Sequence, residues 1–146
     1  QFLYSWRRFL LRCFGAKIGK GVIIRPSAQI TYPWKVKIGD YSWIGDDVVL
    51  YSLGDIIIGN NTVISQKSYI CTGTHDYTKA DFPILGKKII IGDECWLATD
   101  VFVSPGVTIN NGAVIGARST VIKDLESNSV YVGSPVRFIK KRKIEQ

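Results

Sequence analysis

Residues 91–125 read IGDECWLATDVFVSPGVTINNGAVIGARSTVIKDL, and aliphatic side chains recur in this stretch every six residues. The large aliphatic positions are Ile91, Leu97, Val103, Ile109, Ile115 and Val121. A second set, mostly small or mid-sized, follows each of them by four positions: Cys95, Val101, Val107, Ala113, Ser119 and Leu125. A fixed period of this kind identifies an internal repeat, and the repeat decides the architecture.

The period of six fits neither an α-helix nor an ordinary amphipathic strand. In a helix, steps of six residues would rotate by about 240° and scatter the aliphatic side chains around the axis. In a plain strand, alternation would last a few residues and then stop. A chain that bends every six residues satisfies both observations, because about three short strands then form one coil of a triangular β-solenoid. Small or polar residues after the large aliphatics, such as Gly92 and Ser104, suit the corners.

The same corner recurs earlier in the chain, which extends the predicted solenoid over residues 17–136. The Ile-Gly pairs that mark this corner begin at residues 18, 38, 58 and 91, so the first two intervals are twenty residues and the third is thirty-three. The longer interval contains a polar insertion at about residues 73–90 that breaks the hexad. We expect this insertion to form a loop that protrudes from one corner.

Residues 1–16 differ from the repeat and predict a short amphipathic helix over residues 2–14. Apolar side chains recur there at helical spacing, with three arginines on the opposite side. The apolar residues are Phe2, Leu3, Trp6, Phe9, Leu10 and Cys13, and the arginines are Arg7, Arg8 and Arg12. The helix either covers the unpaired edge of the first coil or rests on anionic lipid, and the two roles are compatible.

The composition limits the compartment and the partners. The chain of 146 residues suits one domain, and its formal charge of +7 favours anionic partners without identifying one. Cys13, Cys71 and Cys95 are an odd number and lack metal-ligand spacing. Cys71 and Cys95 fall at inward or corner positions of the repeat, which favours buried free thiols over a disulfide and fits the reducing cytoplasm. No signal peptide or spanning segment is visible, and because the sequence contains no Met we expect it to lack some N-terminal residues. We predict no nucleic-acid partner.

The C-terminal residues 137–146 form a basic tail with two open interpretations. Five of the seven residues from Arg137 to Lys143 are Lys or Arg. The segment can be a solvated tail that closes the last coil, or a cationic patch that binds phosphates. Charge alone does not distinguish between them.

His75 is the single histidine of the sequence and lies at the start of the insertion. A lone histidine is usually structural, but functional groups collect on polar loops beside a repetitive scaffold, and a neutral imidazole can accept a proton from a hydroxyl group. Asp76 is adjacent but need not contact it. One histidine per chain cannot supply the three-histidine zinc site of β-solenoid carbonic anhydrases, so we predict no metal. No P-loop, Cys-x-x-Cys or dinucleotide-binding motif is present.

Several segments, taken in order, resemble the hexapeptide-repeat O-acetyltransferases. They are GTHDY (Gly73–Tyr77), IGDECWL (Ile91–Leu97), PGVTI (Pro105–Ile109), VIGA (Val114–Ala117) and GSPV (Gly133–Val136). The sequence is most similar to the colanic acid or exopolysaccharide acetyltransferases, whose sequences also resemble TYPW (Thr31–Trp34) and CTG (Cys71–Gly73). The resemblance covers nearly the whole chain. It implies an all-β, left-handed parallel β-helix, an exception to the usual right-handed crossover, and a homotrimer with active sites between neighbouring subunits.

The resemblance also implies a reaction and its residues. The protein would acetylate a sugar hydroxyl of a polysaccharide precursor with acetyl-CoA, by direct transfer without an acyl-enzyme and with His75 as general base. Ile122 departs from the pattern, since several members have Thr there. Coenzyme A would contact Trp96 along the acyl-donor channel, the backbone of Thr99 and Ala117 along the pantetheine arm, and Lys123, Arg137 and Lys140 at the phosphates. Asp46 and Asp47 match acceptor-binding positions across the subunit interface.

The acceptor would be a sugar or a lipid-linked saccharide. A lipid-linked acceptor would give the basic N-terminal helix a use as a peripheral contact with the inner face of the membrane. The alternative interpretation is a non-catalytic trimeric solenoid scaffold that binds a glycan or a protein partner. The alternative predicts no binding of coenzyme A and leaves His75 without a role.

Overall fold

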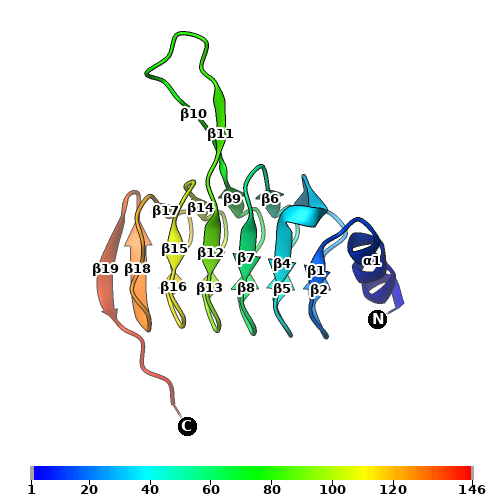
Figure 1. Cartoon of the computed structure of the whole chain (residues 1–146). Coiled ribbons are helices and arrows are strands. Elements are labelled where there is room, and N and C mark those ends of the chain that lie inside the picture. The colour runs from blue at the N-terminus through cyan, green and yellow to red at the C-terminus, as the bar shows by residue number, and fades with distance from the viewer. Residues whose placement is uncertain (1, 146) are drawn as a thin grey trace.

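A computed structural model describes residues 2–145, which form a β-solenoid with one α-helix at its N-terminal end (Figure 1). Helix α1 spans Phe2–Cys13, and a 3₁₀ helix, η1, spans Pro33–Lys35. The strands are β1 (Lys17–Ile18), β2 (Ile23–Ile24), β3 (Gln29–Ile30), β4 (Val36–Ile38), β5 (Trp43–Ile44), β6 (Val49–Tyr51), β7 (Ile56–Ile58), β8 (Val63–Ile64), β9 (Tyr69–Cys71), β10 (Gly73–His75), β11 (Ile84–Gly86), β12 (Ile89–Ile91), β13 (Trp96–Leu97), β14 (Phe102–Val103), β15 (Thr108–Ile109), β16 (Val114–Ile115), β17 (Thr120–Val121), β18 (Ser129–Gly133) and β19 (Val136–Lys141).

Three sheets of parallel strands form the sides of the solenoid. The first sheet contains β1, β4, β7, β12 and β15; the second contains β2, β5, β8, β13, β16 and β18; and the third contains β3, β6, β9, β14 and β17. Strands one coil apart pair in register, so that Ile38 lies beside Ile58 and Ile58 beside Ile91. Strand β19 extends the second sheet antiparallel to β18. The predicted solenoid, its N-terminal helix and its protruding segment are all confirmed.

The core lies inside the coils and follows the six-residue period. All six large aliphatic positions from Ile91 to Val121 are fully buried, and the second set, from Cys95 to Leu125, is at most 3% exposed. In the earlier coils Ile24, Ile44 and Ile64 occupy the same inward column. Stacking like residues on like positions removes one continuous apolar column from water, which is the main stabilising contribution.

A ladder of Asp and Asn side chains joins the coils at the corner after the first sheet. An oxygen of Asn60 accepts a hydrogen bond from the backbone N–H of Asp40 at 2.7 Å, and Asp93 and Asn111 repeat the contact on the coils that follow. A β-carbon at Gly59 would overlap the Asp93 carboxylate. The residue at this corner is glycine because the ladder oxygen of the next coil lies against it, as it does at Gly19, Gly39, Gly59 and Gly92.

The corner conformation differs in one respect from the sequence expectation. The left-handed backbone lies three residues after the large aliphatic, at Glu94 (φ +55°), Asp100 (φ +59°) and Arg118 (φ +57°), and not at the small residue directly after it. Gly92 has no positive φ. Glycine takes the same place at Gly106 (φ +83°) and Gly112 (φ +74°). The small residue directly after the aliphatic serves the close approach of neighbouring coils, whereas the turn three residues on is made by glycine or by longer side chains.

Helix α1 satisfies the open edge of the first coil with its arginines. In the second coil, the carbonyl oxygens of Ile38, Ser42 and Val48 accept hydrogen bonds from backbone N–H groups of the first coil. The equivalent carbonyls of the first coil have no such partner, because no coil precedes it within residues 2–145. Arginine side chains donate to them instead: Arg12 to Ile18 at 2.7 Å, Arg8 to Val22 at 2.7 Å and Arg7 to Ala28 at 2.5 Å. These contacts are what the cap interpretation of residues 1–16 expects.

Candidate active site

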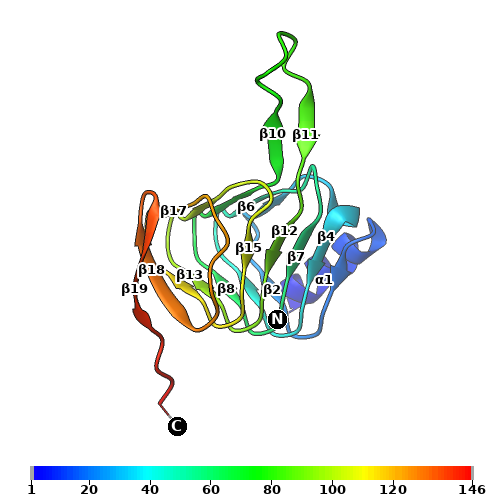
Figure 2. The same ribbon diagram turned by 60° about the vertical axis from the view of Figure 1, so that its left-hand side comes forward.

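The insertion forms a β-hairpin that carries His75 away from the solenoid (Figure 2). Strands β10 and β11 pair antiparallel, with Gly73 opposite Gly86 and His75 opposite Ile84. The hairpin leaves the corner between β9 of the third sheet and β12 of the first sheet. The expected protruding loop is therefore partly regular structure, and its backbone pairing holds the histidine at a defined height above the corner.

The imidazole of His75 is exposed and is oriented by a backbone carbonyl. Its Nδ1 lies 2.6 Å from the carbonyl oxygen of Phe82. A carbonyl oxygen can only accept, so Nδ1 carries the proton, and in the neutral imidazole it is Nε2 that has the lone pair. Phe82 has a left-handed backbone (φ +46°) in the turn of the hairpin. This arrangement prepares Nε2 to accept a proton from a bound hydroxyl group.

Asp76 does not orient His75. One carboxylate oxygen of Asp76 accepts hydrogen bonds from the backbone N–H of Thr78 at 3.0 Å and from the Thr78 hydroxyl. These bonds to Thr78 lower the pKa of Asp76. The orienting group is instead the backbone of Phe82, seven residues away, which sequence reasoning missed because a main-chain carbonyl has no side-chain signature.

Three of the predicted coenzyme A contacts lie on one side of the solenoid. Trp96 is on the outer face of the second sheet, 49% exposed, and its Nε1 donates to the Ser65 hydroxyl at 3.0 Å. Thr99 and Ala117 lie on the corner that follows this sheet, on successive coils. A hydrogen bond of 2.8 Å from the Arg118 backbone N–H to the Thr99 carbonyl joins those coils. The structure thus brings Trp96, Thr99 and Ala117 to neighbouring positions.

The three predicted phosphate contacts are distributed over the last coil. Lys123 follows β17 of the third sheet and lines a groove of about 380 Å³ with Phe138 and Lys141. Arg137 and Lys140 are exposed on β19, at the end of the second sheet. Within one chain Lys123 lies on a different corner from Thr99, so the predicted contacts form two groups.

Asp46 and Asp47 lie on the corner between β5 and β6, away from the corner that carries the hairpin. The Asp46 carboxylate pairs with Nε of Arg25 at 3.0 Å and raises the Arg25 pKa. Arg25 also donates to the Tyr4 hydroxyl of α1, so Asp46 is engaged within its own chain. Asp47 is exposed. A single chain does not bring either carboxylate to His75.

Two further properties concern residues 2–145 only. No group of three or more His, Cys, Asp and Glu side chains in this range could hold a metal ion. No helix in this range is long and apolar enough to cross a membrane. Of the cysteines, all free thiols, Cys95 is buried, Cys71 is half-buried and Cys13 is exposed.

The sequence matches no protein-family model. It is 62% identical over 142 residues to the colanic acid biosynthesis acetyltransferase WcaF of Escherichia coli K12, a match that covers 97% of this chain and 78% of that relative. The fold superposes on a maltose O-acetyltransferase from Clostridium difficile 630 with a TM-score of 0.89 and 30% identity, covering 97% of this chain and 77% of that one. A hexapeptide-repeat acetyltransferase from Vibrio cholerae, solved with acetyl coenzyme A, gives a TM-score of 0.88 and 26% identity over 96% of this chain and 78% of its own.

These likenesses extend over the coils, the hairpin and the last strand pair, since they cover nearly all of the chain. The chain belongs to the hexapeptide-repeat acetyltransferases.

Proposed function

We propose that the protein transfers the acetyl group of acetyl-CoA to a hydroxyl group of a sugar in a polysaccharide precursor, with His75 as general base. The observation that carries this proposal is the imidazole on the hairpin, whose Nδ1–H is fixed on the Phe82 carbonyl and whose Nε2 is open. The names of the relatives, one in colanic acid biosynthesis and one a maltose O-acetyltransferase, support a saccharide acceptor.

The proposed reaction needs one proton acceptor and no covalent enzyme intermediate. Nε2 of His75 takes the proton of the acceptor hydroxyl group while the hydroxyl oxygen forms a bond to the thioester carbonyl carbon. The Phe82 carbonyl stabilises the resulting imidazolium through the Nδ1–H bond. Collapse of the tetrahedral adduct breaks the carbon–sulfur bond, and the imidazolium returns its proton to the thiolate of coenzyme A. A backbone N–H donor at the carbonyl oxygen would stabilise the adduct.

The residues proposed to hold acetyl-CoA suit its parts. The half-exposed Trp96 indole offers an apolar surface to the acyl-bearing end, and the exposed corner at Thr99 and Ala117 offers backbone groups to the amides of the pantetheine arm. Arg137 and Lys140 supply exposed cations on β19 for the phosphates. Lys123, on the other corner, would act from the neighbouring chain or at a separate phosphate.

A trimer would complete the site, and an apolar stripe on the second sheet favours one. Outward side chains of successive coils there lie in register, and Trp43, Val63 and Trp96 are each about two-fifths to one-half exposed. A contiguous exposed stripe of this kind is typical of a surface that another chain covers. Asp47, on a different corner from His75, would then face the hairpin of a neighbouring chain and contact the acceptor. Asp46 would have to leave Arg25 to do so.

The decisive experiment combines binding and transfer. Calorimetry should detect binding of coenzyme A to the protein, sedimentation velocity should give a mass three times that of the chain, and mass spectrometry should detect an added acetyl group on members of a sugar panel. The free thiols of Cys13 and Cys71 are compatible with an enzyme that acts in the reducing cytoplasm. Absence of coenzyme A binding would reject the proposal and leave the non-catalytic scaffold.

A further inference from the structure

Helix α1 faces the solenoid with its charged side. The guanidinium groups of Arg7, Arg8 and Arg12 all donate to backbone carbonyls of the first coil. Arg7 is sufficiently enclosed that desolvation lowers its pKa. The three arginines that the sequence offers for contact with anionic lipid therefore bind the first coil, with Arg7 and Arg8 partly buried and Arg12 exposed at the end of the helix. The main external contact of α1 must use its other face.

The other face of α1 is apolar and exposed. Phe2 is 82% exposed, and Trp6 and Phe9 are 52% and 53% exposed, with their rings stacked at 5.6 Å between centroids. Leu3 and Leu10 extend the same face. Amphipathic helices of monomeric proteins normally bury this side, so a partner is expected. Helix α1 lies across the end of the solenoid (Figure 1), and since its arginines contact the first coil, the opposite face points outward from that end.

Positive charge is concentrated at this end and at the basic C-terminal tail. Residues 1–39 contain eight Lys and Arg and no Asp or Glu, residues 40–136 contribute a net charge of −5, and residues 137–146 contribute +4. An anionic partner is therefore drawn to either end of the solenoid and not to its middle. At the N-terminal end this charge adjoins the exposed, stacked rings of Trp6 and Phe9.

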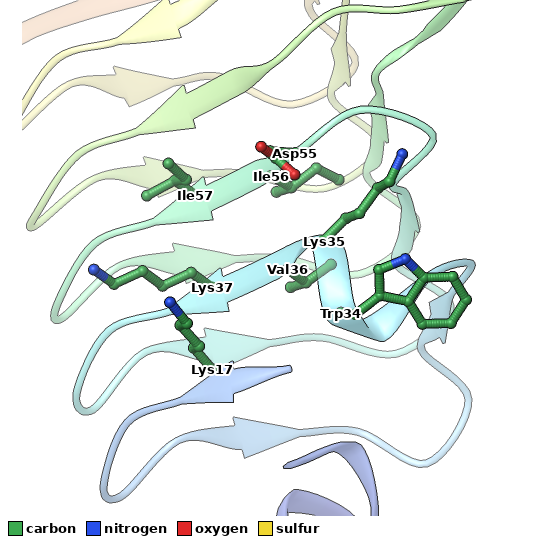
Figure 3. A pocket seen from close by; sticks show the side chains of 8 residues that line it. All are labelled: Lys17, Trp34, Lys35, Val36, Lys37, Asp55, Ile56 and Ile57. Carbon is green, nitrogen blue, oxygen red and sulfur yellow. The ribbon is translucent and has the colours of Figure 1, made fainter. Parts of the chain in front are cut away.

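Two lysines beside α1 remain available to such a partner. Lys17 and Lys37 are direct neighbours in the first sheet, where like charges repel. Within residues 2–145 neither lysine forms an ion pair, and both line a groove of about 230 Å³ with the exposed Trp34 (Figure 3). A second groove continues from Lys17 and Lys37 to Arg12 at the end of α1. Asp40 also lines this second groove, which brings the two lysines next to Arg12 of α1. The lysines and the outer face of α1 together make up the end surface.

We propose that this end surface, the outer face of α1 with Lys17 and Lys37, docks the protein on an anionic lipid bilayer. Trp6 and Phe9 enter the boundary between headgroups and acyl chains, and the lysines contact lipid phosphates. The solenoid then stands on the membrane by its N-terminal end, with β19 directed away from it. A bilayer is favoured over a second copy of the chain, because a second copy would bring two strongly positive ends together. The inference depends on the fold and the charge, and does not require acetyl transfer.

Flotation with vesicles tests this proposal. The intact chain should float with vesicles of phosphatidylcholine and phosphatidylglycerol, bind weakly to phosphatidylcholine alone, and lose binding as salt is raised. The double variant Trp6→Gln, Phe9→Gln should reduce binding about tenfold or more, because two aromatic side chains no longer enter the bilayer. Lys17→Glu with Lys37→Glu should reduce binding by about tenfold on the anionic vesicles only.

The matched control changes an exposed apolar pair at the opposite end. Phe138 and Ile139 are 52% and 55% exposed on β19, and Phe138→Gln with Ile139→Gln should bind vesicles as the parent does. Circular dichroism checks that each variant is folded. If the α1 double variant does not fold, the lysine double variant still tests the proposal. Failure of the parent to float, or equal losses in the control, would overturn the proposal. A smaller sedimenting mass for Trp6→Gln, Phe9→Gln would overturn it too, by assigning α1 to a contact between chains.

Discussion

Replacement of His75 by asparagine separates the proposed role of the imidazole as a base from its hydrogen bond within the hairpin. The amide nitrogen of asparagine falls near the position of Nδ1, so His75→Asn can still donate to the Phe82 carbonyl that lies 2.6 Å from Nδ1. It offers nothing at the position of Nε2. The variant should therefore keep the hairpin and lose only the group that accepts the proton.

The expected loss follows from general base catalysis. Removal of a positioned base lowers turnover by about 100- to 10,000-fold, which corresponds to about 2.7 to 5.5 kcal/mol of transition-state stabilisation. His75→Ala should lose a similar factor, together with the single hydrogen bond to Phe82. Because the imidazole is exposed, that bond contributes at most about 1 kcal/mol to the free energy of unfolding.

The assay follows release of free thiol from acetyl-CoA in the presence of a competent sugar acceptor. Calorimetry with coenzyme A is run in parallel and should give the same affinity for the parent, His75→Asn and His75→Ala. Turnover of His75→Asn within about tenfold of the parent would refute the assignment, since removal of a general base lowers turnover by about 100-fold or more. Equal loss of coenzyme A binding in both variants would show that the hairpin, and not the base, had been damaged.

Three further predictions test other parts of the molecule. Gly59→Ala should lower the free energy of unfolding by about 1–3 kcal/mol in chemical denaturation, because the new β-carbon overlaps the Asp93 carboxylate of the next coil. The control Asp93→Asn keeps the oxygen that accepts the hydrogen bond from Asn60 and should lower it less. Burial raises the pKa of the Cys95 thiol, so iodoacetamide should modify Cys13 in the native protein and Cys95 only after denaturation, as read by mass spectrometry; equal rates would contradict the buried position. Trp96→Ala should weaken coenzyme A binding about ten- to hundredfold in calorimetry, because the half-exposed indole is the apolar surface proposed for the acyl-bearing end, and an unchanged affinity would remove Trp96 from the site.

The fold is readable from the sequence because one physical rule acts at every coil. An inward aliphatic must recur at the same point of each short side, so the six-residue period of Ile91, Leu97 and Val103 maps directly onto a buried column. The insertion is readable for the same reason, as the segment where the period fails. The left-handed turn at Glu94 and Arg118 was not predicted, because neighbouring coils impose it on residues that do not favour it by themselves.

The N-terminal helix illustrates a limit of periodicity. Helical spacing separates Arg7 and Arg12 from Trp6 and Phe9, and so predicts two faces, but it does not say which face is turned inward. The ordinary expectation is that the apolar face packs on the protein. The opposite holds here, because the first coil presents unpaired carbonyls that only donors can satisfy.

The candidate site divides in the same way between sequence and structure. A solitary histidine in a break of the repeat is visible in the sequence, and so is the likeness to acetyltransferases around it. The protonated nitrogen of His75 is decided by a carbonyl that reaches it only when β10 and β11 pair. Likewise, Trp96, Thr99 and Ala117 become neighbours only because coils stack at a fixed spacing. Periodicity along a chain determines which side chains are buried, whereas the directions of hydrogen bonds between distant segments exist only once the chain has folded.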